Sequence, residues 1–186
     1  MQKNGMGCSL CGRAVLPVGL GIGELALPAP LIILLPVTPS TDSPVLLLRT
    51  ATLHDAECLA ELSCQLGYPA GAEDILKRLA QIESRDDNAV FVAVASGKVI
   101  GWVHIMAREL LESGRYAEIG GLVVDELRRG QGAGQALMNK AEEWAREHHC
   151  REIVVRSNVI RSAAHRFYEK IGYRVTKSQK VFRKAT

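Results

Sequence analysis

A stretch of arginine and glycine, RRGQGAGQAL at positions 128–137, contains residue types that can hold an anion. It lies between an apolar run typical of a strand and a pattern typical of a helix. A helix N-terminus presents unpaired backbone N–H groups and the positive end of the helix dipole, so it binds phosphate when the preceding chain comes close. The glycines would remove obstructing side chains, and the arginines would add charge. The alternative is a plain glycine-rich turn.

The spacing of the glycines distinguishes between nucleotide-binding motifs. A Rossmann G-x-G-x-x-G motif requires a third glycine where Gln135 stands. A P-loop requires Gly-Lys followed by Ser or Thr, and this tripeptide is absent from the sequence. The pattern that fits is R-x-x-G-x-G at positions 129–134, directly after the predicted strand.

This pattern resembles the acyl-CoA signature (Q/R)-x-x-G-x-(G/A) of the Gcn5-related N-acetyltransferase (GNAT) family. A second segment, SNVIRSAAHRFYEKIGYR at 157–174, is similar to the closing segment of that family, with an Asn after a strand and a Phe-Tyr-Glu-Lys-x-Gly-Tyr ending. The resemblance covers about residues 46–182. It implies a GNAT fold and acetyl-CoA as the cosubstrate.

The resemblance also implies how acetyl-CoA would bind. Its pyrophosphate would contact the backbone amides from Gly130 to Gln135, and its pantetheine arm would lie along the preceding strand. Asn158 would meet the pantetheine from a neighbouring strand, which in this family splays away to open a wedge. The implied cofactor-binding residues are Leu122, Val123, Val124, Arg129, Gly130, Gln131, Gly132, Ala133, Gly134, Gln135 and Asn158. No metal is expected.

Acetyl transfer from a thioester to an amine needs a neutral amine, a stabilised oxyanion and a protonated thiolate. An amine of pKa about 10.4 is neutral in roughly one molecule in 2,500 at pH 7, which corresponds to about 4.6 kcal/mol. A thiol of pKa near 8.5 asks for about 2 kcal/mol at most. A base should therefore matter more than an acid.

Two side chains are the candidates for this proton transfer. The resemblance implies Tyr168 as the acid that protonates the thiolate, and a phenol of pKa about 10 is protonated at pH 7. Glu118 is the candidate base because it precedes Gly120-Gly121 on the strand expected to bear the acyl group. At a pKa near 4.3 it would need burial or a water relay, and the alternative is an ordinary outward-facing glutamate. His104, on another strand, is an outside candidate.

Gly120-Gly121 predicts a β-bulge, which would free a backbone N–H for the oxyanion, and Leu122 N–H is the first candidate donor. The alternative is close packing of a neighbour against a strand without side chains. An acyl-cysteine route is disfavoured because Cys58, Cys64 and Cys150 lie off the motif.

The elements that must position these residues can be read from hydrophobic periodicity. The pattern predicts an α/β (α+β) fold with the order β-α-α-β-β-β-α-β-α-β. The resemblance adds a central mixed, mostly antiparallel and splayed sheet with helices on both faces. The expected strands lie at about 45–51, within 89–107, at 116–125, 152–157 and 173–184, with a loop at 108–115, and the expected helices lie at 53–68, 72–83, after 134 and at 160–172.

Residues 1–44 differ in composition from the rest of the chain. We expect a poorly ordered N-terminal extension, a linker or start-site artefact, ahead of a GNAT domain at 45–186. A membrane-spanning helix is disfavoured by Glu24, three glycines and four prolines in the apolar stretch. Cys8 and Cys11 form a CxxC without the further ligands that zinc requires.

Charge and cysteine content limit the partners. With 23 Lys and Arg against 20 Asp and Glu, the net charge of +3 does not by itself argue for nucleic acid or a membrane. Five cysteines, an odd number, suit a reducing cytoplasm. A homodimer is compatible with the sequence. Basic residues gather near the C-terminus, which keeps nucleic-acid binding open as a minor hypothesis: Arg174, Lys177, Lys180, Arg183 and Lys184.

The sequence thus predicts an acetyl-CoA-dependent N-acetyltransferase that acts on a primary amine of a small molecule or peptide by a sequential mechanism. Glu109, Glu112 and Glu118 could attract a cationic amine, and the chain looks like small members often labelled aminoglycoside acetyltransferases. The alternative is a non-catalytic acyl-CoA-binding regulatory module on the same fold.

Overall fold

The computed structural model describes residues 45–185, and the predictions for 1–44 lie outside the described residues. The elements, in chain order, are β1 (Leu47–Thr50), η1 (Leu53–Asp55), α1 (Ala56–Leu66), α2 (Ala72–Glu83), β2 (Asn88–Ala95), β3 (Lys98–Leu110), β4 (Gly114–Val124), η2 (Glu126–Arg128), α3 (Ala133–Glu147), β5 (Ile153–Val155) and α4 (Ser162–Lys170). The predicted alternation of strands and helices is confirmed up to α4.

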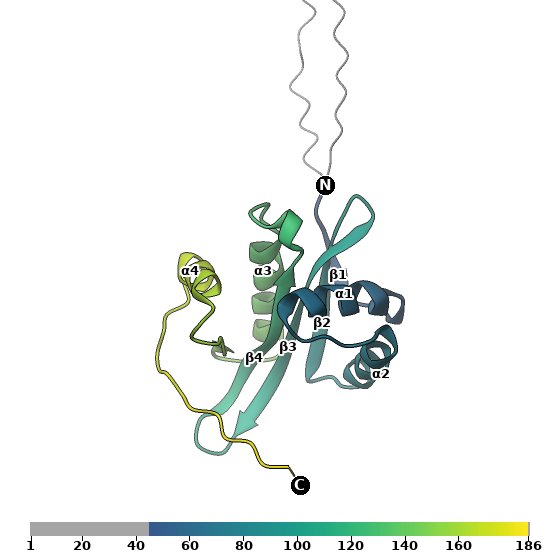
Figure 1. The fold of residues 1–186 in the computed structure, drawn as a ribbon. Coiled ribbons are helices and arrows are strands. Elements are labelled where there is room, and N and C mark those ends of the chain that lie inside the picture. The colour runs from purple at the N-terminus through teal and green to yellow at the C-terminus, as the bar shows by residue number, and fades with distance from the viewer. Residues whose placement is uncertain (1–44, 186) are drawn as a thin grey trace, which may run out of the picture. The chain divides into compact units, whose positions relative to one another are not determined.

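The strands form one mixed sheet in the order β1-β2-β3-β4-β5. The first four strands are antiparallel, and β5 runs parallel to β4. Helices α1 and α2 cover one face of the sheet, while α3 and α4 lie against the other (Figure 1). The mostly antiparallel sheet with helices on both faces is therefore confirmed.

Successive side chains of the central strands point to opposite faces of the sheet, and apolar side chains form a core on each face. On the α3 face, Val103 and Ile105 of β3 are fully buried with Leu137 of α3. On the α1–α2 face, Val92 of β2 packs with Leu59. Each such side chain contributes about 1.5–3 kcal/mol on burial, so the apolar periodicity fixes which side of each strand faces which helices.

The sheet opens at its β4 edge. β5 pairs with β4 only over Ala117–Ile119, whereas β4 continues to Val124. Within residues 45–185, the last five residues of β4, 120–124, have no strand partner on this side. This is the splay that the family resemblance implied.

A β-bulge lies at the start of the open segment. His104 pairs with Gly121 while Ile105 pairs with Ile119, so Gly120 is an extra residue in β4. A methyl group on Gly120 would lie 2.6 Å from Met106 Cε, and one on Gly121 would lie 2.8 Å from the Trp102 ring. The predicted bulge and its alternative, close packing, are thus both present.

Two element predictions were wrong. The expected loop at 108–115 is mostly strand, because β3 and β4 pair as far as Leu110 and Gly114. The expected last strand at 173–184 is absent, and residues 173–185 have no regular secondary structure. Val175, Val181 and Phe182 are exposed, so this basic segment has no buried apolar face that would reward pairing.

Candidate active site

The glycine stretch lies between η2 and α3, as the sequence predicts. Gly130 and Gly132 have φ values of +79° and +86°, which glycine adopts without strain. Among the described residues, Ala136 is the first in this stretch whose backbone N–H donates to a protein acceptor, the carbonyl of Gly132 at 3.0 Å. The amides of residues 130–135 therefore remain available to an anion at the α3 N-terminus.

The third glycine has a different role from the first two. No atom lies within 4 Å of a methyl group built on Gly130 or Gly132, but a methyl group on Gly134 would lie 3.3 Å from the Phe167 ring. Gly134 thus allows α4 to pack closely on α3, whereas the sequence had suggested one role for all three glycines.

The backbone of β4 faces the splay at Leu122 and Val124. Asp125 N–H donates to Ile100 O at 2.8 Å, and Gly101 pairs with Val124. Because N–H and C=O groups alternate in direction along an antiparallel pair, those of Leu122 and Val124 point away from β3. Arg129 Nε donates to Val124 O at 3.3 Å, which holds the guanidinium beside this edge, and the Val123 side chain is buried.

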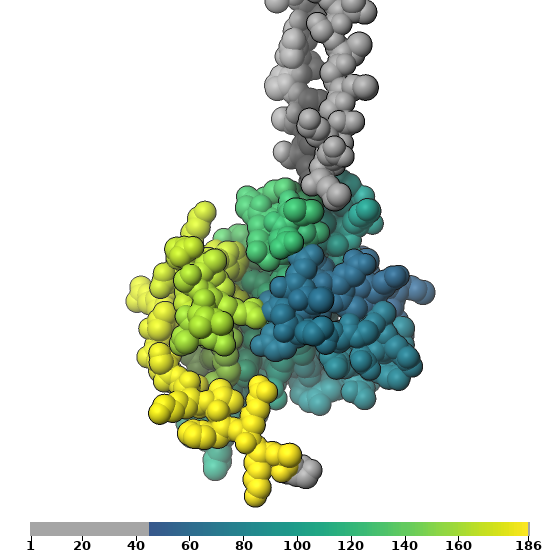
Figure 2. Space-filling view, in the orientation of Figure 1, coloured from purple at the N-terminus to yellow at the C-terminus, as the bar shows by residue number. Residues whose placement is uncertain are grey.

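Asn158 lies across the splay, in the turn between β5 and α4. Its Oδ1 accepts from Ile160 N–H at 3.2 Å, and its backbone carbonyl accepts from Arg161 N–H at 2.9 Å. Arg161 Nη2 in turn donates to Leu66 O at 2.7 Å, so the start of α4 is tied to the end of α1. Figure 2 shows these two parts of the surface in contact.

Tyr168 is held on α4 by aromatic neighbours. Its ring lies 5.3 Å from that of Phe167 and 6.0 Å from that of Tyr173. Burial raises the pKa of Tyr168 above its usual value, and Arg161 opposes this in part. The phenol is therefore protonated at neutral pH, as an acid for the thiolate must be.

Glu118 lies between two guanidinium groups. Its Oε1 accepts from Arg156 Nε at 2.9 Å, and its Oε2 lies 3.7 Å from Arg108 Nε, with only 17% of the side chain exposed. Oε2 receives no hydrogen bond from either arginine, so a role as base, directly or through a water relay, stays a prediction of the sequence.

A cavity of about 340 Å³ lies between the α1–α2 helices and the sheet. Trp102 and His104 of β3 and Gly120 of β4 form its sheet side, and apolar side chains of the helices form most of the rest, including Leu59, Leu66, Ile75, Leu79 and Ile82. The sequence pattern that could have predicted this side of the cavity is the spacing of Trp102 and His104, which are two residues apart and so lie on one face of β3.

The charge of this cavity differs from the sequence expectation. Arg78 is the charged side chain in its wall, and no carboxylate of the described residues lines it. Glu109 forms an exposed pair with Arg115 at 3.7 Å, and Glu118 is paired as above. The glutamates proposed to attract a cationic amine therefore do not line the cavity.

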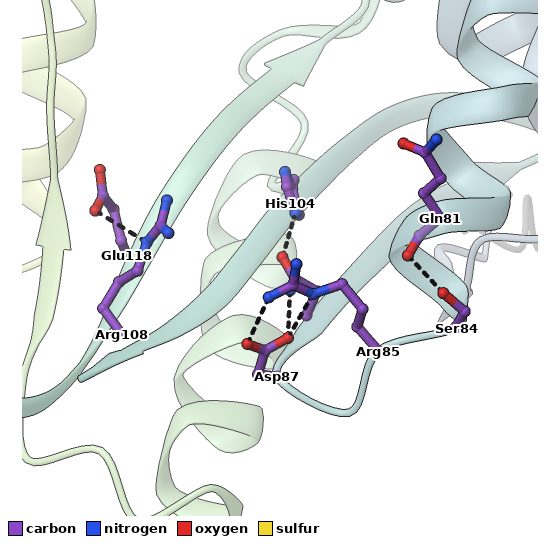
Figure 3. A network of polar contacts seen from close by, with 8 residues as sticks. Gln81, Ser84, Arg85, Asp87, His104, Arg108 and Glu118 are labelled. Atoms are coloured by element: carbon purple, nitrogen blue, oxygen red, sulfur yellow. Dashed lines mark hydrogen bonds and ion pairs between the residues drawn. The ribbon is translucent and has the colours of Figure 1, made fainter.

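His104 belongs to a hydrogen-bonded chain at the cavity. Its Nε2 lies 3.2 Å from Asn88 Oδ1, and Asn88 Nδ2 donates to Asp87 Oδ1 at 2.6 Å. Arg85 donates twice to Asp87, at 2.9 and 2.8 Å (Figure 3). The hydrogen bonds from Arg85 lower the pKa of Asp87 to about 2. Burial lowers the pKa of His104, and the positive charge of Arg108 lowers it further.

Neither a membrane helix nor a metal cluster occurs in residues 45–185. None of the helices there is long and apolar enough to cross a bilayer. No three His, Cys, Asp or Glu side chains gather there as metal ligands would.

Comparison with known proteins identifies the family to which this arrangement corresponds. Residues 55–173 match the model of the acetyltransferase (GNAT) family. The chain is 30% identical to aminoglycoside N(6')-acetyltransferase type 1 of Stenotrophomonas maltophilia over 141 residues, which are 73% of this chain and 91% of that protein. It is 33% identical to aminoalkylphosphonate N-acetyltransferase of Salmonella typhimurium, covering 70% of this chain and 86% of that protein.

Solved structures agree in fold. An aminoglycoside N-acetyltransferase in complex with CoA aligns with a TM-score of 0.72 at 20% identity, over 78% of this chain and 99% of that one. An acetyltransferase of Trypanosoma brucei aligns with a TM-score of 0.64 at 26% identity, over 75% of this chain and 99% of that one.

Proposed function

Because the chain belongs to the acetyltransferase (GNAT) family and is an acetyl-CoA-dependent N-acetyltransferase, we propose that it transfers the acetyl group directly to a primary amine of a small molecule or peptide. The observation that carries this proposal is the meeting of three features: the free amides at the start of α3, the open edge of β4 and the cavity that reaches Gly120. Together they would bring a thioester and an amine to the same point of the sheet.

In this proposal the cofactor lies across the splay. The amides of residues 130–135 and the Arg129 side chain hold the pyrophosphate, and the outward carbonyl of Leu122 and the outward N–H of Val124 pair with the pantetheine. Asn158 contacts the pantetheine from the opposite side. The start of α3 attracts the diphosphate because its unpaired N–H groups and the helix dipole both favour negative charge.

The reaction forms a C–N bond at the thioester carbonyl and breaks the C–S bond. Leu122 N–H would stabilise the oxyanion, since it points into the splay just after the bulge. Tyr168 would give its proton to the departing thiolate. Glu118 remains a candidate base, directly or through a water relay.

The composition of the cavity supports a choice between acceptor types. The two curated relatives described above act, by their names, on an aminoglycoside or an aminoalkylphosphonate. An apolar wall with Arg78 and without carboxylates disfavours a polycation, so we propose an amine with an apolar body and an anionic group. Here Arg78 would pair with the anion while the amine reaches Gly120.

A screen of amines with thiol release as readout tests both the reaction and the acceptor. Its arms are apolar amines with and without a carboxylate or phosphonate, together with an aminoglycoside. We expect release to be fastest with the anionic apolar amines, and Arg78→Met to raise KM for these but not for uncharged amines. Intersecting initial-rate lines would support the sequential mechanism. Acetyl-CoA binding without release on any amine would favour the non-catalytic alternative.

Three further properties stay predictions of the sequence. These are a cytoplasmic location, a homodimer and the absence of nucleic-acid binding through the basic C-terminal segment. Fractionation, light scattering and salt-dependent retention on nucleic acid would test them.

A further inference from the structure

The imidazole of His104 faces the acceptor cavity beside the bulge in β4. A methyl group built on Gly120 would lie 2.9 Å from His104 Nδ1 and 3.5 Å from its Cε1. This edge of the ring is therefore directed over Gly120, and both residues line the cavity. Nδ1 thus borders the part of the cavity nearest to Leu122, where the thioester is proposed to lie.

The hydrogen-bonded chain behind His104 selects one tautomer of the ring. Asn88 Nδ2 is committed to Asp87 Oδ1 at 2.6 Å, so Asn88 presents its oxygen to His104 Nε2. An amide oxygen only accepts hydrogen bonds, which places the imidazole proton on Nε2 and the lone pair on Nδ1. Arg85 fixes Asp87 by two hydrogen bonds (Figure 3), so the orientation of Asn88 is itself supported.

The surroundings of His104 keep the ring neutral. The ionisable groups that line the cavity with His104 are Tyr68 of the α1–α2 connection and Arg78 of α2, and Asp87 before β2, Arg108 of β3 and Glu118 of β4 belong to the polar contacts beside it. Asp87 and Glu118 are each neutralised by arginine. Burial, and secondly Arg108, lower the pKa of His104, so the ring can accept a proton at pH 7.

We propose that His104 is the general base of the reaction, accepting at Nδ1 the proton of the acceptor amine, and that Asn88 is the positioning residue that sets its tautomer. The assignment rests on the proposed function, because it requires an amine in the cavity. It gives the base a lone pair inside the cavity, whereas Glu118 is not among the residues that line the cavity.

The step balances as follows. The acceptor arrives as an ammonium ion and gives one proton to Nδ1. The neutral nitrogen attacks the thioester carbonyl, the C–N bond forms, and the carbonyl electron pair moves to oxygen. When this pair returns, the C–S bond breaks and the thiolate takes a proton from Tyr168. The acylated nitrogen still carries one proton more than the amide product, and this proton passes through solvent to the tyrosinate of Tyr168. His104 then releases the proton that it accepted to water.

The direct test is the pH profile of kcat/KM for His104→Gln, with thiol release as readout. We expect a loss of about 10²- to 10⁴-fold at pH 7 and disappearance of the acidic limb that the imidazole produces in the wild type. His54→Gln, at an exposed histidine of η1, is the matched control and should leave rate and profile unchanged. Affinity for CoA and the thermal midpoint should be retained in His104→Gln, which separates a catalytic loss from misfolding.

Two more variants distinguish His104 from Glu118 and from a structural role. Asn88→Asp places a negative charge beside Nε2–H, which should raise the pKa of the imidazole and move the acidic limb to higher pH. Glu118→Gln should keep the acidic limb. If Glu118→Gln removed that limb while His104→Gln retained it, the assignment would be overturned.

Failure of the proposed function has a different signature. In that case the wild type itself would release no thiol with any amine, whatever the state of His104. The ¹⁵N chemical shifts of the imidazole then decide the positioning claim without an acceptor: a proton on Nε2 that is lost or shared in Asn88→Ala supports it, and a proton on Nδ1 in the wild type overturns it.

Discussion

Tyr168 meets one requirement for an acid that protonates a thiolate, because its hydroxyl is protonated at neutral pH. Its ring is fixed by Phe167 and Tyr173, and burial raises the pKa of its hydroxyl. Because the raised pKa keeps the proton on oxygen across the neutral and mildly alkaline range, the acid should not limit the rate there.

We expect Tyr168→Phe to lower kcat by about 10²-fold or more, since only the transferable proton is removed. The dissociation constant for CoA, measured by calorimetry, should change less than about twofold. Tyr173→Phe is the matched control: it removes a hydroxyl that donates to Glu142 at 3.1 Å, which should cost about 1 kcal/mol of folding free energy and leave kcat intact. An unchanged kcat in Tyr168→Phe would remove this residue from the acid role.

The sequence predicts the role of a single residue only where that role depends on its neighbours in the chain. The motif at 129–134 led to the start of α3 because its glycines are neighbours in the chain, and a local pattern can express that geometry. The partners of Glu118 could not be found in this way, because Arg108 lies on β3 and Arg156 directly follows β5, both distant from Glu118 in sequence. The same holds for Gly134, whose contact with Phe167 depends on how α4 packs on α3.

At the scale of elements, two glycines at the start of α3 differ in what an added side chain would do: at Gly132 it would strain the backbone, and at Gly134 it would press on a neighbouring ring. Gly132 caps the helix with φ of +86° in open space, so Gly132→Val strains the turn that presents the amides. We expect weaker CoA binding by about tenfold or more and a modest loss of stability, measured by calorimetry and thermal unfolding.

Gly134→Val is the matched variant within the same helix. Its side chain would press on the Phe167 ring at 3.3 Å or less, so we expect the larger loss of thermal stability here, of about 1–3 kcal/mol. Equal effects of the two variants on CoA affinity and stability would contradict the separate roles.

The junction of β1 with α1 depends on a partly buried ion pair between Arg49 and Asp55. Asp55 accepts two hydrogen bonds from Arg49 at 2.7 Å and one from Thr52 N–H at 2.7 Å, and only 8% of its side chain is exposed. The Arg49 hydrogen bonds, against the opposing effect of burial, lower the pKa of Asp55 to about 2. This carboxylate therefore stabilises the fold above the pKa of the unfolded state, about 3.9, and loses its effect as the pH falls toward 2.

Asp55→Asn should lower the free energy of unfolding by about 2 kcal/mol at pH 7, from a shift of nearly two pKa units. The difference in free energy of unfolding between variant and wild type should shrink as the pH falls from about 4 to about 2. Urea unfolding at several pH values in this interval measures it. Glu73→Gln, in an exposed pair with Lys77, is the control and should change stability by less than about 0.5 kcal/mol at any pH. A difference that persists at pH 2 would argue against the ion pair as its cause.

Helices and strands were predicted correctly where the periodic apolar side chains are also buried. β2, β3 and α3 were predicted because their apolar positions repeat with the period of a strand or helix and do face a core. The last segment failed this condition: Val175 and Val181 alternate with polar residues, yet both are exposed. The hairpin tip was misjudged because the pairing of Glu109 with Arg115 extends a polar stretch as strand.

At the scale of the whole domain, the site exists only where elements distant in sequence converge. The splay is a property of β4 and β5, the anion site of α3, and the cavity of α1, α2 and the sheet. The family resemblance implied the splay and the glycine motif predicted the anion site, whereas the lining of the cavity depends on tertiary packing that no single segment expresses. The acceptor was for this reason the least predictable part of the function.

Binding of acetyl-CoA across the splay should stabilise the domain as a unit. At a ligand concentration of about 100 times Kd, linkage gives roughly 2.7 kcal/mol, which corresponds to a rise of about 5–10 °C in Tm for a domain of this size. Hydrogen exchange should slow at the amides of Leu122, Val124 and residues 130–135, because these would donate to the cofactor, while α2 should exchange as before. Protection confined to α1 and α2 would instead place the cofactor in the acceptor cavity. Such a result would exclude the arrangement in which β4 lies between an amine on one side and a thioester at its open edge.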